Sequence, residues 1–328
     1  MNGVVIIDKP AGFTSHDVVN RVRRILGQRS VGHLGTLDPM ATGVLPLVIG
    51  NFTRLAQFYT KAAKTYEGTI RFGFATDTYD AEGEPVGTAQ EVSLRTEDIE
   101  ALAAQFRGLI EQTPPPFSAK KIHGVPAYKL ARRQKDVVLK PVQVEIKEFH
   151  ILAVERDRVR FTARVASGTY LRSVAHEMGQ RLGCGAHLES LRRTAVAEFT
   201  LAEAHTLDEL AQRCESNGRR AIPEGTGAGG PGIPATTTVA APSTAESLFI
   251  HPRKLLPELP CVTTDELTAA RIRSGRTVNL PDLSRARQIK VFCGQADLLA
   301  IATRVAGTLF HPAIVFSASG RDEEKGSG

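Results

Sequence analysis

The sequence predicts an α+β fold, followed by a low-complexity segment and a smaller α+β unit. Three observations support this prediction. Residues 65–72 and 158–165 alternate apolar and polar side chains, which is the pattern of half-buried strands. Residues 15–26 and 96–106 carry apolar side chains at helical spacing. Residues 224–245 are rich in Gly, Pro, Thr and Ala and have almost no charge, so they predict a linker rather than a core.

Composition narrows the class of protein. The 328 residues suffice for two domains, and the net charge of +6 suits a polyanionic partner such as nucleic acid, although many other proteins share it. Four widely spaced cysteines form no CxxC pair, which indicates reduced intracellular thiols. Apolar runs are too short to cross a membrane, and the N-terminus lacks the features of a signal peptide. We therefore expect a cytoplasmic protein without a membrane segment.

The first elements follow from local chemistry. The β-branched run 4–7 predicts a buried strand. Ser15 is the expected N-cap of the first helix, which Gly27 ends. The apolar run 44–49 predicts a strand, but Pro46 cannot donate to a sheet ladder, so we expect an edge strand or an irregular segment.

Later elements follow the same rules. Thr96 is the expected cap of the helix 96–106, and residues 167–173 open a helix that runs to about residue 182. In that helix His176 and Glu177 resemble part of a zinc motif, but the second histidine is missing, so both are interpreted as structural. Further short elements are a helix at 53–61 and strands or extended segments at 142–146, 158–165 and 188–196.

One loop stands out as a candidate functional segment. Residues 32–46 hold three glycines and two prolines, so they form neither a regular helix nor a simple strand. His33 and Asp38 are its only side chains suited to acid–base chemistry. Asp38 is either a presented carboxylate or a turn-capping residue, and the loop alone does not decide between them. The acidic turn 76–83 lacks the ligands and flanking helix of a calcium loop, so no metal site is predicted.

A basic stretch and a tyrosine suggest contact with nucleic acid. Residues 117–140 carry seven cations and one acidic residue, Asp136. Such a patch fits a phosphate backbone, and a solubilising loop is the alternative. Tyr66, in the predicted strand 65–72, is either a core aromatic or a stacking platform in a cleft.

The predicted domains are 1–212, a catalytic domain, and 248–320, a small C-terminal domain, separated by a disordered linker at 213–247 and followed by a frayed tail at 321–328. In the C-terminal part a capping box at 263–266 begins a helix that ends at Gly275. Three strand-like runs follow, at 288–292, 298–303 and 309–316.

Five segments in order resemble the bacterial TruB family of tRNA pseudouridine-55 synthases. They are 8–15 (DKPAGFTS), 32–43 (GHLGTLDPMATG), 76–80 (TDTYD), 168–173 (GTYLRS) and 191–194 (LRRT). The resemblance spans essentially the whole chain outside the linker. It implies the pseudouridine synthase fold, a mixed and mostly antiparallel sheet with flanking helices and a central cleft, followed by a PUA-like RNA-binding domain.

The resemblance also implies roles for individual residues. Asp38 matches the catalytic aspartate, and Arg172 matches the arginine that pairs with it. A guanidinium there would lower the pKa of the carboxylate and fix its direction. Tyr66 matches the tyrosine that stacks on the target base and in some proposals assists removal of the C5 proton. The other matched positions are His33, Tyr170, Leu191 and Lys9 at the substrate pocket, and a basic RNA-clamping insertion at 117–140 with Lys120, Lys121, Arg132 and Arg133 on the RNA backbone.

The implied partner is the T-arm of tRNA, bound by a monomer that flips the uridine out of its stack. The reaction involves no redox change and no external group, so neither a cofactor nor a metal is expected. Three other functions are possible alternatives: a non-catalytic RNA-binding or RNA-folding protein, a guide-RNA-dependent synthase, and a glycoside hydrolase. The absence of long basic termini argues against a guide-dependent enzyme, and the lack of a convincing second carboxylate near Asp38 argues against a glycoside hydrolase.

Overall fold

A mixed sheet forms the frame of the N-terminal part of the protein. The structure, a computed structural model, describes residues 1–118, 121–122, 125–126, 139–218 and 248–316. Within these residues the sheet has ten strands, in the order β14-β1-β3-β12-β4-β11-β10-β7, with β2 on β3 and β13 on β12. The strands are β1 (Gly3–Lys9), β2 (Val31–His33), β3 (Thr42–Ile49), β4 (Lys64–Phe72), β7 (Gly108–Gln112), β10 (Val142–Glu155), β11 (Arg158–Val165), β12 (Ala186–Val196), β13 (Phe199–Thr200) and β14 (Ala204–His205).

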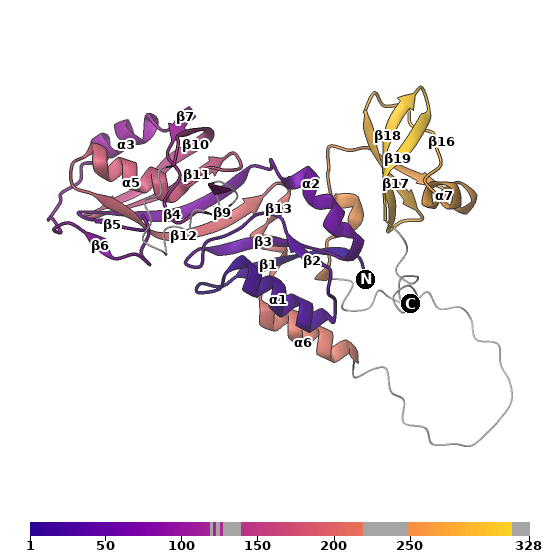
Figure 1. The fold of residues 1–328 in the computed structure, drawn as a ribbon, viewed down its shortest axis with the longest axis horizontal. Helices are drawn as coiled ribbons and strands as arrows, with labels where there is room; N and C mark the ends of the chain where they lie inside the picture. Colours follow the sequence, from indigo (N-terminus) through magenta and orange to yellow (C-terminus); the bar gives the residue numbers. More distant parts are fainter. Residues whose placement is uncertain (119–120, 123–124, 127–138, 219–247, 317–328) are drawn as a thin grey trace, which may run out of the picture.

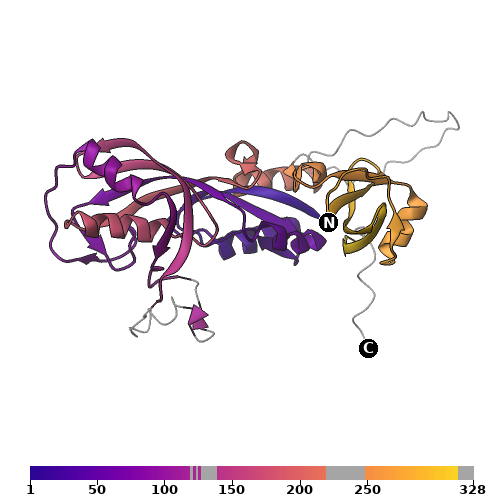
Figure 2. The same cartoon turned by 90° about the horizontal axis from the view of Figure 1, so that it is seen from above.

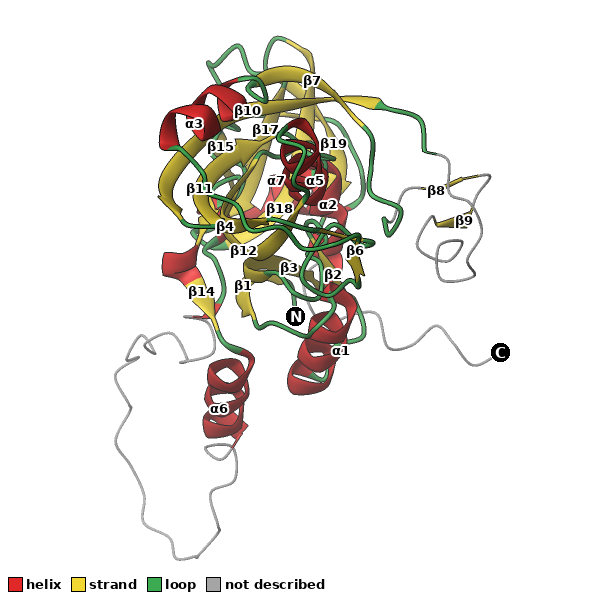
Figure 3. Ribbon diagram, turned by 90° about the vertical axis from the view of Figure 1, so that its left-hand side faces the viewer, coloured by secondary structure: helices red, strands yellow, loops and turns green. Residues whose placement is uncertain are grey.

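Most neighbours in this sheet are antiparallel. The parallel pairs are β1 with β14 and β12 with β3. Two small hairpins stand outside the sheet, β5 (Ala75–Thr76) with β6 (Pro85–Val86), and β8 (Lys121–Ile122) with β9 (Val125–Pro126). Figure 3 shows β8 and β9 apart from the main sheet. The mixed, mostly antiparallel α+β architecture is the fold predicted from the sequence.

Helices cover different regions of the sheet. Figure 1 shows α3 (Thr96–Ala104) and α5 (Leu171–Arg181) towards one end and α1 (Ser15–Leu26) and α6 (Leu207–Gly218) nearer the middle. These helices and the sheet enclose one continuous hydrophobic core. The short helical turns η1 (Gly50–Leu55), α2 (Ala56–Tyr59) and η2 (Leu201–Glu203) complete this part. Of the described helices, none has the length and apolarity needed to cross a membrane.

The C-terminal part forms a separate five-stranded sheet, in the order β15-β17-β18-β19-β16, at the far end of an elongated molecule (Figure 2). Its elements are η4 (Pro252–Lys254), β15 (Cys261–Thr264), α7 (Glu266–Arg273), β16 (Val278–Asn279), β17 (Gln288–Cys293), β18 (Asp297–Ala306) and β19 (Leu309–Val315). A second hydrophobic cluster joins this sheet to β1, β3 and η1. Glu198 reinforces the junction, because its carboxylate accepts the Tyr59 hydroxyl at 2.6 Å and the Leu256 amide at 2.9 Å.

Three helix starts differ from the sequence prediction. Thr14, not Ser15, caps α1 through a capping box with Asp17. Arg95, which makes no side-chain capping bond, precedes α3, so Thr96 is its first helical residue. Asp265 alone caps α7, because residues 263–264 pair with β17 and therefore belong to a strand.

Pro46 was also misjudged, because β3 is an inner strand between β1 and β12. The Pro46 carbonyl accepts the Leu34 amide at 2.9 Å on the β2 side. A residue's nitrogen and carbonyl point to the same side of a strand, and the β2–β3 ladder stops at Leu47. The missing N–H of Pro46 therefore faces the end of β2, and the β1–β3 ladder loses no bond.

The predicted linker begins too early, because α6 continues to Gly218. Leu207, Leu210 and Cys214 lie at helical spacing and pack against the main core, which extends the helix beyond residue 212. The rest of that segment, 219–247, lies outside the described residues.

Candidate functional site

The loop between β2 and β3 presents Asp38 on a braced backbone. Ser15 Oγ accepts the Leu37 amide at 2.8 Å, and the Pro39 carbonyl accepts the Gly12 amide at 2.9 Å. The carbonyl of Asp38 itself accepts the Ala41 amide at 3.1 Å, which closes a turn. Ser15, predicted as a helix cap, instead fixes this loop.

Arg172 approaches the Asp38 carboxylate from the first turn of α5. Its Nε lies 2.9 Å from Oδ2, and its Nη2 donates to Oδ1 at 3.2 Å. The Arg172 side chain is only 6% exposed, whereas that of Asp38 is 35% exposed. The guanidinium also donates to the carbonyls of Thr78 at 3.2 Å and Phe117 at 3.0 Å. The ion pair predicted from the resemblance is thus present, with the carboxylate open to a ligand and the arginine fixed behind it.

Asp80 completes a charged triad that the sequence analysis missed. Its Oδ2 lies 3.3 Å from Arg172 Nη1, and its side chain is 4% exposed. The Thr78 hydroxyl donates to Asp80 Oδ1 at 2.6 Å, and the Glu82 amide donates to it at 3.1 Å. The acidic turn 76–83 therefore carries a second carboxylate close to Asp38, and the statement that none lies nearby was wrong. The signal was present in the 76–80 motif, but the sequence did not indicate which acidic residue turns inward.

Burial raises the pKa of Asp38 above its ordinary value, and the Arg172 charge opposes this rise. The carboxylate of Asp80 adds to the rise, while the Lys9 ammonium lowers the pKa of Asp38. The expectation of a lowered pKa considered only the arginine. Because the Asp38 side chain keeps a third of its surface in solvent, the ion pair with Arg172 remains compatible with an ionised carboxylate near neutral pH.

Two predicted aromatic residues lie close to Asp38. Tyr66, on β4, is 8% exposed, and burial raises the pKa of its hydroxyl, with Arg193 opposing the rise and Asp38 adding to it. Tyr170 immediately precedes α5, where its amide donates to Gln112 Oε1 at 2.8 Å. The charges of Asp38 and Arg172 both act on the Tyr170 hydroxyl, whose pKa is raised mainly by burial.

The other predicted pocket residues have more varied surroundings. Leu191 on β12 is 9% exposed and lies opposite Gly68 on β4. His33 on β2 is half-buried, its Nδ1 accepts the Gly35 amide at 3.3 Å, and burial lowers its pKa.

Lys9 is placed differently from its predicted role. It is fully buried, and its Nζ donates to the carbonyls of Phe13 at 2.5 Å, Pro10 at 2.9 Å and Pro39 at 3.1 Å. Burial lowers the pKa of Lys9 to about 8. The side chain has no exposed surface for RNA, so its role in this structure is to hold the Asp38 loop.

The predicted RNA-backbone residues cannot be placed. Lys120, Arg132 and Arg133 lie outside the described residues, and Lys121 is described only as part of β8.

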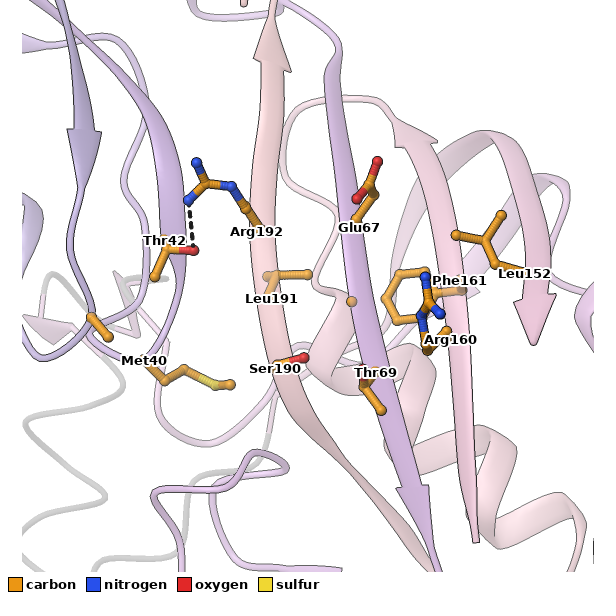
Figure 4. Close-up of a pocket in the computed structure, with 12 residues that line it drawn as sticks. Met40, Thr42, Glu67, Thr69, Leu152, Arg160, Phe161, Ser190, Leu191 and Arg192 are labelled. Carbon is orange, nitrogen blue, oxygen red and sulfur yellow. Dashed lines mark hydrogen bonds between the residues drawn. The ribbon is translucent and has the colours of Figure 1, made fainter. Parts of the chain in front are cut away.

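A hollow of about 420 Å³ lies near the site but does not include it (Figure 4). Outward-facing side chains of β4, β11 and β12 line it, among them Glu67, Arg160 and Arg192, together with Met40 and Leu191. Asp38 and Arg172 are not among its lining residues.

Comparisons with known proteins agree with this geometry. Residues 23–171 match the family model "TruB family pseudouridylate synthase (N terminal domain)", and residues 172–221 match "tRNA pseudouridylate synthase B C-terminal domain". A protein of Solibacter usitatus named tRNA pseudouridine synthase B is 46% identical over 318 residues, which are 96% of this chain and 100% of that protein. One of the same name from Opitutus terrae is 47% identical over 210 residues, 64% of this chain and 87% of the relative.

Solved structures share the fold at lower identity. A Cbf5–Nop10–Gar1 complex contains a chain with a TM-score of 0.64 and 24% identity, covering 93% of this chain and 79% of that one. An H/ACA ribonucleoprotein bound to a substrate RNA containing 2′-deoxyuridine gives a TM-score of 0.67 and 22% identity, covering 96% and 85%. The motifs, the fold and a relative that matches over nearly the whole length of both chains lead to one conclusion: the chain belongs to the TruB family of pseudouridylate synthases.

Proposed function

We propose that the protein isomerises uridine to pseudouridine at position 55 in the T-loop of tRNA, with Asp38 as the catalytic carboxylate. The observation that carries the proposal is the Asp38–Arg172–Asp80 triad, in which only the Asp38 carboxylate is substantially exposed. Family membership supports uridine isomerisation, and the names of the relatives support tRNA as the substrate.

The reaction is an internal rearrangement. The bond from N1 of uracil to C1′ of ribose breaks, the base turns, and a bond from C5 to C1′ forms. The C5 proton is released and N1 ends protonated, so atoms and electrons balance without a cofactor. A carboxylate beside the ribose or base can act as nucleophile or promote elimination.

The arrangement of this chain suits such a step. Arg172 fixes the direction of the Asp38 carboxylate. Tyr66, which is 8% exposed, matches the family tyrosine that stacks on the flipped base, and stacking there would need the base to reach the exposed edge of its ring. Extrusion of the uridine costs a few kcal/mol, which stacking and phosphate contacts offset. The proposal includes a monomeric enzyme of the cytoplasm that grips the T-arm, with the C-terminal domain as a PUA-like RNA-binding module.

A non-catalytic RNA-binding protein on the same scaffold is the main alternative. It has no need of an arginine held between two carboxylates, one exposed and one buried, and this observation favours the enzyme.

Release of tritium from tRNA labelled at C5 of uridine tests the proposal. The wild type should release tritium, and Asp38→Asn should lose about 10⁴-fold in rate while keeping most of its affinity for tRNA. A tRNA with cytidine at position 55 is the control for site, and release of tritium from other uridines of that tRNA would contradict the T-loop assignment. Equal rates for wild type and Asp38→Asn would remove Asp38 from the mechanism.

A further inference from the structure

Arg193 is a second buried arginine close to the site, and neither the ion-pair triad nor the family resemblance gives it a role. Its side chain is fully buried. Among the described residues, no carboxylate lies within ion-pair distance of its guanidinium, and the titratable group that acts on it is Tyr66. A buried guanidinium without a carboxylate is costly and requires its donors to be satisfied in another way.

The donors of Arg193 are satisfied by the loop that carries Asp38. Nη2 donates to the Gly35 carbonyl at 3.0 Å and Nη1 to the Thr36 carbonyl at 3.2 Å, before Asp38. Nε donates to the Val44 carbonyl at 2.8 Å, after it. One rigid, planar group thus ties together the two stems of the loop, which lysine with its single nitrogen cannot imitate.

The strand register places Arg193 between the loop and Tyr66. Strand β12 lies between β3 and β4, and Arg193 pairs with Gly43 on one side and with Tyr66 on the other. The Tyr66 hydroxyl interacts with the same guanidinium. Any movement of Arg193 therefore changes the position of the Asp38 loop relative to the Tyr66 ring.

Gly35, whose carbonyl accepts from Arg193, has a backbone conformation that favours glycine. Gly35 has a φ of +123°, and a Cβ there would lie 3.0 Å from Lys64 Cε and 3.6 Å from Arg193 Nη1. The positive φ favours glycine, and a Cβ would crowd Lys64, whereas its contact with Arg193 would be an ordinary one.

We infer that Arg193 is a positioning residue for the isomerisation, which sets the spacing between the Asp38 carboxylate and the Tyr66 ring. This inference rests on the proposed function, since that function places Asp38 and Tyr66 at the reacting base. Arg193 does not touch the substrate, because its guanidinium is enclosed by the loop and β4. Its loss should lower kcat and leave KM and tRNA affinity nearly unchanged.

The test compares Arg193→Lys with Arg192→Lys, the same substitution at the neighbouring position. Arg192 points to the other face of β12, where it pairs with Asp8 at 2.7 and 3.0 Å and lies near Thr42 (Figure 4). We expect Arg193→Lys to lower kcat by about 10- to 100-fold, with KM and Kd for tRNA within about threefold of wild type. Arg192→Lys should keep kcat within about twofold, since a half-exposed pair contributes little.

Two further measurements separate positioning from a purely structural role. The fraction of folded Arg193→Lys is measured from the stoichiometry of tRNA binding, and a fall in kcat that only matches a fall in this fraction would overturn the inference. A double-mutant cycle with Tyr66→Phe should give an effect smaller than the product of the single effects, because the two residues act together. Independent effects would refute the link to Tyr66.

Failure of the inference and failure of the proposed function are distinguishable. If the wild type releases no tritium from tRNA, the proposed function is wrong, whatever Arg193 does. If the wild type is active and Arg193→Lys keeps the kcat of Arg192→Lys, the function stands and the positioning role is refuted.

Discussion

Gly43→Ala is expected to damage both stability and catalysis, because Gly43 is where the loop meets β12. The residue has a φ of +99°, which side chains rarely adopt. A Cβ there would lie 2.2 Å from the carbonyl oxygen of Arg193 and 3.0 Å from its carbonyl carbon. Both are backbone atoms, so no side-chain rotation relieves the contact.

The size of the effect follows from two contributions. The backbone conformation costs about 1–2 kcal/mol for alanine. Strands β3 and β12 must separate by roughly 1 Å to reach ordinary contact, which weakens their short parallel pairing at Thr42 and Gly43 by about 1 kcal/mol per hydrogen bond. Over the two paired residues the variant should lose about 3–4 kcal/mol in total, which most domains survive.

Gly27→Ala is the matched control. Gly27 ends α1 with a φ of +60°, and a Cβ there would meet no atom within 4 Å. This variant should lose about 1–2 kcal/mol and keep kcat. Urea denaturation gives the stabilities, and tritium release gives the rates at saturating tRNA. For Gly43→Ala we expect kcat to fall by about 100-fold, because the Asp38 loop shifts. Equal stability losses in the two variants, with full activity in both, would refute the close approach of the loop to β12.

Two further predictions concern buried charges. Asp80→Asn should lower kcat about tenfold or more with KM unchanged, because it loosens Arg172 without exposing a new surface to RNA. It should also shift the acid limb of the pH profile of kcat to lower pH, since the Asp80 charge raises the pKa of Asp38. A change in KM alone would contradict this prediction. Lys64→Met tests burial of Lys64, whose pKa falls from 10.5 unfolded to about 8 folded. Between about pH 8 and pH 10.5 the folded chain binds fewer protons than the unfolded chain. The free energy of unfolding of the wild type, measured by urea denaturation, should therefore rise relative to that of Lys64→Met by up to about 3 kcal/mol over this range. A stability difference between the two proteins that does not vary with pH would show that Lys64 is solvated.

Local sequence rules predicted the fold class and most elements, and failed where tertiary contacts reassigned a residue. Ser15 has good capping chemistry, but its hydroxyl is used by the Leu37 amide, so Thr14 caps the helix instead. Pro46 cannot donate a hydrogen bond, yet it lies in an inner strand because its nitrogen faces the end of β2 and not β1. In both cases the contact that decides the outcome is made with a residue outside the local segment, so a local sequence pattern cannot predict it.

Only part of the candidate site could be predicted from the sequence, again because contacts between distant residues decide the rest. Asp38 and Arg172 lie in recognisable motifs, so the resemblance brought them together although 134 residues separate them. Asp80 and Arg193 lie in quoted motifs too, but neither was given a role. In the strand 186–196, Arg192 and Arg193 must face opposite sides, and local pattern does not indicate which side is buried. That choice depends on β3 and β4, which flank the strand.

The buried cations around Asp38 brace its loop, and two cations oppose the rise in the pKa of its carboxyl that burial causes. Lys9 and Arg193 satisfy their donors with main-chain carbonyls of the Asp38 loop and its neighbours, so their hydrogen bonds are made while their charges remain. A carboxylate partner would have cancelled the charge, whereas a carbonyl does not. The remaining field of Lys9 and Arg172 opposes the rise in the pKa of Asp38 that burial causes. Folding therefore meets the cost of burying these cations, and the proposed reaction would take place in a site that is already organised. It follows that loosening the loop also weakens the field on its carboxylate, so stability and activity should fall together when these contacts are removed.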